Sequence, residues 1–269
     1  MGPYPLHLCQ PDDRKSCGAC CGLYNWQDHS RQTLRELLGR RTSFFWESPQ
    51  DGRLTEFRES VALLPPRAKL LEAIYNCEFL GFIDPDQRRV GCLLHPSLHG
   101  GEEMRVHSFY GPELCGGHFC PSYTYLSPLE QGMVIAAIDD WYLYGLVITD
   151  IDFVKGFADE VQSRLGDPLR VERLTFPGVR QALGEYFRLK ESWRFASRQN
   201  RLGKYYFNYE EYRIAHIDYE KQWRMKPSRF NAILISLASE FQSRQEIEEA
   251  ESIIEEKIEK FLEAYQGRL

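Results

Sequence analysis

The amino-acid sequence predicts an α+β protein, mostly α, in which a small irregular Cys-rich region with a β-hairpin precedes a helical region. All eight cysteines lie in the first 120 of the 269 residues, and residues 121–269 contain none. Beyond position 127, apolar residues recur at the spacing of amphipathic helices. We therefore expect a metal-binding domain over residues 1–126 and a helical domain over residues 127–269, with a soft boundary.

The first element is a cysteine knuckle in residues 16–26. Cys17 and Cys20 have two residues between them, a spacing at which a tight turn directs two thiolates at one metal ion, and Gly18 supplies the backbone freedom for that turn. Cys21 adjoins Cys20, and neighbouring side chains diverge from the backbone. The pair therefore favours either two adjacent metal centres or one multi-iron cluster that takes different cysteines on different atoms.

The chain after the knuckle predicts two short helices with a loop between them. Ser30 can cap a helix that ends at Gly39, and Pro65 with Pro66 can open another that runs through residue 74. Residues 42–58 combine aromatic anchors with Pro and Asp-Gly turn signals, so we interpret them as short strands or a turn. The pair Arg40-Arg41 is interpreted as part of a solvated face.

A β-hairpin is expected next. Two apolar runs, at residues 79–83 and 90–94, flank a turn that begins with Asp84-Pro85. Antiparallel pairing would bring Cys77 and Cys92 to the same end of the ribbon. They are predicted to share a site or to lie on neighbouring sites.

Residues 95–121 form a Gly- and His-rich stretch without periodicity, which predicts a loop held in place by metal. Polar loop histidines are the favoured interpretation for each one, and an imidazole ligand in place of a thiolate is the alternative. His118, between two cysteines, has the strongest claim to a place near a metal. The histidines of this stretch are His95, His99, His107 and His118.

The second half predicts a series of capped helices. Residues 127–130 read Ser-Pro-Leu-Glu, a capping box with Pro at the first helical position. Asp150 and Gly166 delimit the next helix, and Pro177 opens a third. A fourth helix is expected over residues 230–241, and a last one after Ser243. The aromatic stretch at residues 204–209 is expected to pack against this bundle.

The net charge and the hydropathy of the sequence limit the kinds of partner that we expect. The formal net charge of -6 disfavours a nucleic-acid surface. No stretch approaches the roughly 20 apolar residues of a membrane span, and the N-terminal residues do not form a signal peptide. We therefore expect a cytoplasmic protein that binds no membrane, with an unidentified protein as the candidate partner. In a reducing compartment, clustered cysteines favour metal binding over disulfides.

The cysteine pattern resembles a known family. Cys17-x-x-Cys20-Cys21, Cys77-Glu-Phe-Leu and Gly91-Cys92-Leu-Leu-His-Pro, with a last pair at Cys115 and Cys120, resemble the CxxCxxCC zinc- or iron-chelating domain of the YkgJ-like cysteine-cluster proteins. The resemblance covers residues 9–121. Cys9 stands farther ahead of Cys17 than in the family pattern, and a Gly- and His-containing insertion precedes Cys115.

The resemblance implies zinc or iron as the cofactor, including an iron–sulfur cluster like the one thought to serve the similar flagellin lysine-N-methylases. The metal ligands that it implies are Cys9, Cys17, Cys20, Cys21, Cys77, Cys92, Cys115 and Cys120. The sequence leaves two functions open: a metal-binding protein without assigned activity, and a metal- or iron–sulfur-dependent enzyme of redox or methyl-transfer type. Thiol–disulfide exchange is disfavoured, because no strand–helix redox fold surrounds Cys17 and Cys20.

Overall fold

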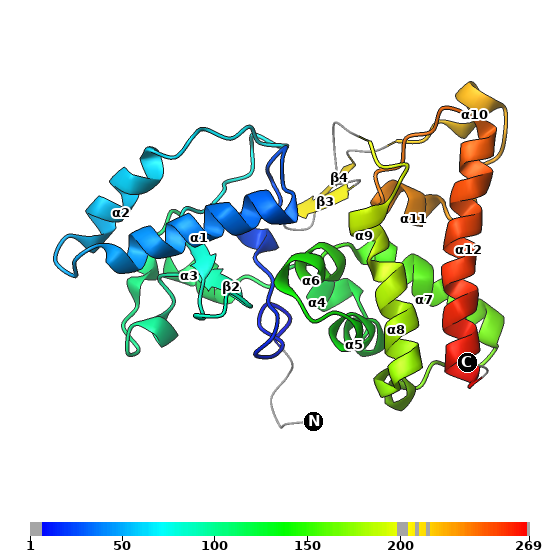
Figure 1. Cartoon of the computed structure of the whole chain (residues 1–269), viewed down its shortest axis with the longest axis horizontal. Helices are drawn as coiled ribbons and strands as arrows, with labels where there is room; N and C mark the ends of the chain where they lie inside the picture. The colour runs from blue at the N-terminus through cyan, green and yellow to red at the C-terminus, as the bar shows by residue number, and fades with distance from the viewer. Residues whose placement is uncertain (1–6, 198–203, 208–209, 214–215, 268–269) are drawn as a thin grey trace. The chain divides into compact units, whose positions relative to one another are not determined.

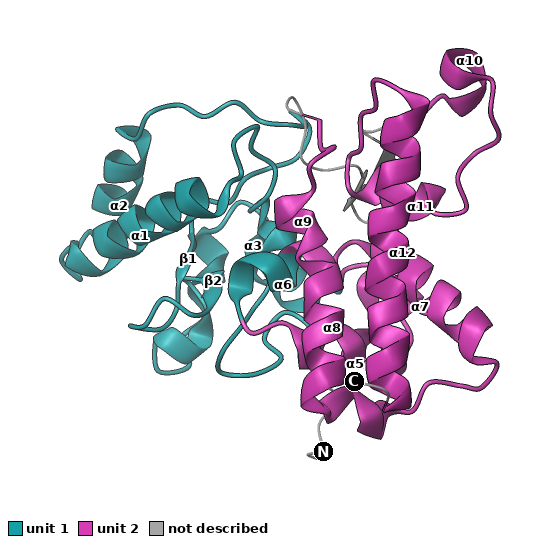
Figure 2. Ribbon diagram, turned by 45° about the vertical axis from the view of Figure 1, so that its right-hand side comes forward, with its two compact units in different colours: residues 1–119, 140–145 teal, residues 120–139, 146–269 magenta. Residues whose placement is uncertain are grey.

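The computed structural model describes residues 7–197, 204–207, 210–213 and 216–267. Helices dominate it and the strands form two small hairpins (Figure 1), which confirms the predicted fold class. The chain divides into two compact units (Figure 2). Unit 1 comprises Met1–Phe119 with Asp140–Gly145, and unit 2 comprises Cys120–Asp139 with Leu146–Leu269. Within the described residues, no helix combines the length and apolar character that a membrane crossing requires.

Unit 1 contains the knuckle, two long helices and the predicted hairpin. The two strands pair antiparallel, with Leu80 opposite Cys92 and Phe82 opposite Val90. Its elements are η1 (Ala19–Cys21), α1 (Arg31–Glu47), α2 (Arg53–Ala62), β1 (Leu80–Phe82), β2 (Val90–Cys92), η2 (Pro96–Leu98), η3 (Met104–His107) and α3 (Gly111–Gly117).

Helix α1 does not end at Gly39, and the expected strands or turn over residues 42–58 are wrong. The helix continues to Glu47, and α2 starts at Arg53. Its buried face extends the helical spacing through Arg41 and Phe45, and Phe45 packs edge-on to Phe57 of α2 at 5.4 Å. Burial of these aromatic residues outweighs the weak helix propensity of one glycine.

The helix predicted after Pro65 is also wrong. Residues 63–79 contain no helix, because their backbone groups bond to the knuckle instead. Leu71 donates its N–H to the Asn25 side-chain oxygen at 2.9 Å, and the Asn25 amide lies 3.0 Å from the Leu71 carbonyl oxygen and 3.2 Å from that of Ile74. Trp26 forms a further antiparallel bridge with Lys69. These tertiary bonds replace the hydrogen bonds of a helix.

Unit 2 is a helical assembly that also contains the second hairpin. Helix α6 (Trp141–Ile148) begins in unit 1 and ends in unit 2. The remaining elements are α4 (Ser122–Tyr125), α5 (Pro128–Ala137), α7 (Ile151–Leu165), η4 (Val171–Thr175), α8 (Pro177–Phe187), α9 (Leu189–Ser192), β3 (Lys204–Phe207), β4 (Glu210–Arg213), α10 (Tyr219–Trp223), α11 (Asn231–Ser236) and α12 (Arg244–Gln266).

The helix caps of unit 2 confirm the sequence signals. Ser127 and Glu130 form the complete capping box of α5. Asp150 caps α7 through the Phe153 N–H, and Gly166 ends it in the left-handed conformation. Ser243 caps α12 through the Glu246 N–H. Some predicted helices are shorter than expected: the helix that Pro177 opens was predicted to run through Trp193 but α8 ends at Phe187, and the fourth helix, α11, ends at Ser236. The predicted packing of residues 204–209 falls on side chains outside the described part.

The core of unit 2 is aromatic. Phe157 of α7 lies 4.2 Å from the ring centre of Tyr186 of α8 and 5.2 Å from that of Phe261 of α12. The Tyr186 hydroxyl is buried and donates to the Phe153 carbonyl at 2.9 Å. Apolar residues that recur at helical spacing beyond position 127, such as Phe157, Tyr186 and Phe261, therefore form the core of unit 2.

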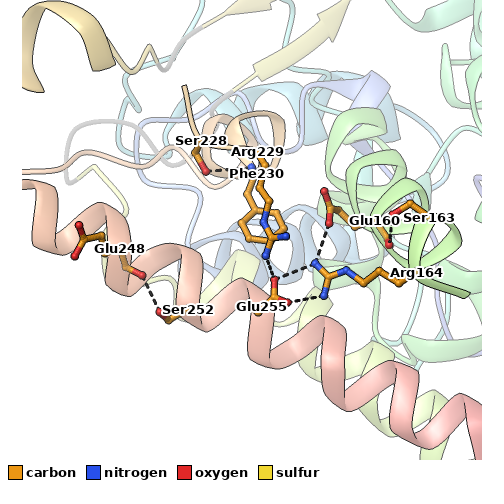
Figure 3. Close-up of polar contacts among 9 residues, drawn as sticks. All are labelled: Glu160, Ser163, Arg164, Ser228, Arg229, Phe230, Glu248, Ser252 and Glu255. Carbon is orange, nitrogen blue, oxygen red and sulfur yellow. Dashed lines mark hydrogen bonds and ion pairs between the residues drawn. The ribbon is translucent and has the colours of Figure 1, made fainter. Parts of the chain in front are cut away.

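A charged network joins α7 to α12 at the rim of this core (Figure 3). Arg164 donates two hydrogen bonds to Glu255, at 2.6 and 2.9 Å, and one to Glu160 at 2.9 Å. Arg229 makes a further ion pair with Glu255. These hydrogen bonds, those from Arg164 foremost, hold the pKa of Glu255 below its ordinary value of 4.5.

The continuity of α1 predicts that Gly39→Ala stabilises the protein. A Cβ at Gly39 meets nothing within 4 Å, so alanine should add about 0.5–1 kcal/mol to the free energy of unfolding measured in urea. At Gly52, where φ is +92°, the same substitution should instead destabilise by about 1 kcal/mol. A loss of stability in Gly39→Ala would mean that the helix ends there.

The network in Figure 3 predicts a pH-dependent effect of Arg164→Gln. Because the folded pKa of Glu255 is lowered, its contribution is complete above the ordinary pKa and is lost as pH falls through the folded one. The variant should lose about 1 kcal/mol at pH 7 and progressively less in acid. Arg229→Gln is the control: its side chain is 57% exposed, so a smaller loss is expected. A deficit independent of pH would contradict this assignment.

Candidate metal centre

The hairpin places two of the cysteines close together. The register pairs Cys92 with Leu80, and Leu93 donates to the Phe79 carbonyl at 2.8 Å, so Cys77 lies just beyond the same end of the ribbon. The expected proximity of these two residues is confirmed.

The knuckle packs directly against the chain that precedes the hairpin. The Cys77 N–H donates to the Cys21 carbonyl at 3.0 Å, and the Asn76 side chain donates to the Gly22 carbonyl at 2.7 Å. Gly22 has φ +78°, and a Cβ there would lie 2.6 Å from the Tyr75 carbonyl oxygen. Glycine is therefore required for the close approach of these two segments.

Helix α3 contributes a fourth cysteine. Cys115 is exposed, and its Sγ lies 3.5 Å from the Ser108 hydroxyl. When it is ionised, its thiolate raises the pKa of both Cys21 and Cys92. We call Cys21, Cys77, Cys92 and Cys115 the Cys21 group: they come from four segments of the chain, and all belong to unit 1.

The Cys21 group sits at the edge of an apolar cluster. Cys77 is one of the cluster's buried members, with Phe45, Phe57 and Phe79, while Cys21 and Cys92 pack against it. Phe57 and Phe79 stack at 5.1 Å. Within this cluster Cys77 is buried, whereas Cys21 and Cys92 are partly exposed.

Burial raises the pKa of three of these thiols, those of Cys21, Cys77 and Cys92. It raises the pKa of Cys77 to about 12 and that of Cys92 to about 11. The pKa of Cys21 is raised well above its ordinary value by burial first and then by the charges of Cys77, Cys92, Cys115 and Cys9. Any metal that binds here must therefore displace protons from the thiols.

The remaining predicted ligands divide between the two units. Cys17 donates its N–H to the Cys9 carbonyl at 2.9 Å, and Cys20 lies in η1 beside Cys21. Cys120 belongs to unit 2, just ahead of α4. As the side chains lie, no three His, Cys, Asp or Glu residues among those described form a group that could hold a metal ion.

The histidines of residues 95–118 have ordinary structural contacts. His95 Nδ1 bonds the Ser97 hydroxyl at 2.7 Å. His99 donates from Nε2 to the Leu93 carbonyl at 2.7 Å and stacks on Trp46. Arg58 donates to the His107 carbonyl at 2.6 Å. His118 follows α3, and burial lowers its pKa.

Arg41 is the residue that the sequence interpretation missed. It was expected on a solvated face, but it is only 6% exposed, whereas Arg40 is exposed. Its Nη1 donates to the Cys77 carbonyl at 3.0 Å. Burial lowers the pKa of the guanidinium, and the charge of Cys77 raises it. The sequence did contain a signal: Arg41 lies at helical spacing from Leu34 and Phe45. Because the helix was expected to end at Gly39, this spacing was not used.

Comparison with protein-family models, with curated proteins and with solved structures finds no match to this chain. The similarity of residues 9–121 to the cysteine-cluster family therefore stays a prediction from the spacing of the cysteines.

The packing of the knuckle predicts that Gly22→Ala disrupts unit 1. The added Cβ would clash with the Tyr75 carbonyl and be strained by the positive φ, so we expect a loss of about 3 kcal/mol in urea unfolding. Gly100→Ala is the matched control, because its φ is +64° but a Cβ there meets nothing within 4 Å. That variant should lose about 1 kcal/mol. Equal losses would show that backbone strain alone, and not the close approach, requires Gly22.

Proposed function

We propose that the protein binds zinc or an iron–sulfur centre through its cysteines, with the Cys21 group as one ligand set. The observation that supports the proposal is that the knuckle and the hairpin bring cysteines from separate segments together: the Cys77 N–H donates to the Cys21 carbonyl at 3.0 Å, and the strand register places Cys92 at the end of the ribbon beside Cys77. Four thiolates are the ligand number and type of structural zinc sites and of many iron–sulfur clusters.

The chemistry of the donors fits this assignment. Thiolates are soft ligands that select zinc and iron–sulfur clusters over calcium or magnesium. The side chains as they lie do not form a ready group, so binding requires that the thiols lose protons and turn about their Cα–Cβ bonds. The hydrogen bond between the Cys77 N–H and the Cys21 carbonyl keeps the two backbones together during that change.

The knuckle supports a second ligand set. Cys20 and Cys21 are neighbours in η1, and adjacent side chains diverge, so we assign Cys20 with Cys17 to a different metal atom from Cys21. The two sets belong either to two zinc sites or to one multi-iron cluster.

Metal content tests the proposal. The full chain, purified without oxygen, should contain zinc, or should contain iron and absorb visible light. Cys21→Ser, Cys77→Ser and Cys92→Ser should each lose the same metal, since they remove ligands of one set. Elemental analysis and the visible spectrum measure this.

Cys20→Ser is the control for the assignment of ligand sets. With two zinc sites it should retain the metal of the Cys21 group, whereas with one cluster it should damage the same chromophore. Circular dichroism of each variant verifies that the helices persist. Wild-type protein with neither zinc nor iron would refute the proposal.

A further inference from the structure

Unit 2 contains a cavity of about 580 Å³, lined by α10 and by the chain that links α11 to α12. Protein sites for small ligands have volumes of this order, and they combine apolar surfaces with a few polar groups. The described lining contains two aromatic rings, one carboxylate and two side-chain amides, and it contains no cysteine, lysine or arginine.

Backbone hydrogen bonds hold one wall of this cavity in place. Ala238 follows α11 with φ +51°, a left-handed conformation that its Cβ disfavours. The Glu240 N–H donates to the Phe195 carbonyl at 2.8 Å, and the Ser197 N–H donates to the Ala238 carbonyl at 2.9 Å. The backbone of residues 238–240 is therefore fixed before any ligand binds, which reduces the entropy lost on binding.

Trp223 and Phe241 form the aromatic part of the lining. Their ring centres lie 6.5 Å apart with an interplanar angle of 74°. Phe241 is buried and packs on Phe195 at 5.4 Å, whereas Trp223 is half-buried. The face of an aromatic ring attracts a cation, and the indole of tryptophan does so most strongly.

Glu240 supplies the carboxylate of the described lining. It is exposed, and its carboxylate has no hydrogen bond or ion pair with any residue that the structure describes. The arginines that contact neighbouring residues are engaged elsewhere: Arg194 forms an ion pair with Glu249, and Arg244 donates to the Trp223 carbonyl. The charge of Glu240 is therefore available to a ligand in the cavity.

We propose that this cavity binds a small organic cation, an alkyl chain that ends in an ammonium group. The ammonium lies over the Trp223 ring and beside the Glu240 carboxylate, and the side-chain amides of Gln222 and Gln242 accept its remaining N–H groups. An anion would meet the Glu240 charge and no lysine or arginine of the described lining. The inference is independent of metal binding, because no cysteine takes part in it.

Three ligands of similar size test the role of charge: n-butylammonium, n-butanol and butyrate. Each is titrated into the reduced full chain near neutral pH, and binding is measured by calorimetry and by tryptophan fluorescence. The ammonium ligand should bind about tenfold more tightly than the uncharged alcohol, and butyrate should bind most weakly.

Substitutions test the residues that recognise the cation. Glu240→Gln keeps the shape of the side chain and removes its charge, so it should weaken n-butylammonium binding about fivefold without changing the affinity for n-butanol. Trp223→Leu should weaken binding of the cation by a similar factor. Glu248→Gln is the matched control, an exposed carboxylate on α12 outside the cavity lining, and should match wild type. Urea unfolding verifies that each variant is folded.

Every contrary result overturns the inference. Equal affinity for n-butylammonium and n-butanol would mean that the cavity selects an apolar chain and not a charge. Wild-type affinity in Glu240→Gln would exclude the carboxylate from the site, and equal losses in Glu240→Gln and Glu248→Gln would indicate a general attraction to an acidic surface. Absence of binding by all three ligands would refute the site itself.

Discussion

Unit 1 depends on the hydrogen bonds that the knuckle makes with residues 68–77. Neither segment has a regular ladder of backbone hydrogen bonds, so each buried backbone group needs its own partner. The buried Asn25 amide supplies several of them at once, and Gly22 allows the backbones to approach. The positions of Cys21 and Cys77 follow from this packing, because the hydrogen bond between their backbones belongs to the same interface.

Electrostatics imposes a second constraint on the same region. Burial raises the pKa of the Cys77 thiol, and the buried Arg41 guanidinium, which donates to the Cys77 carbonyl, has an Nε without a hydrogen-bond partner in the described structure. Neither feature improves the stability of the metal-free fold.

Unit 2 is stabilised by other means. Its helices begin at side-chain caps, bury an aromatic core and are linked at the rim by the Arg164–Glu255 network. These interactions need no sulfur. The hydrogen bonds of the knuckle stabilise unit 1, whereas caps, aromatic packing and the Arg164–Glu255 network stabilise unit 2.

The sequence alone predicted the features that depend on interactions between residues close together in the chain. The capping box at Ser127, the caps at Asp150 and Ser243 and the hairpin around Asp84 depend on bonds between near neighbours, so their residue patterns were sufficient. The candidate metal ligands likewise follow from the spacing of the cysteines along the chain.

Only tertiary structure decided the rest. Helix α1 passes Gly39 because its aromatic face is buried by α2, and residues 63–79 stay irregular because Asn25 bonds them. Which cysteines converge, and that Arg41 is buried beside them, depends on contacts between segments far apart in the chain. Hydrophobic periodicity and helix propensity describe one segment by itself. They give no information on which distant residues hydrogen-bond its backbone or pair with its charged side chains.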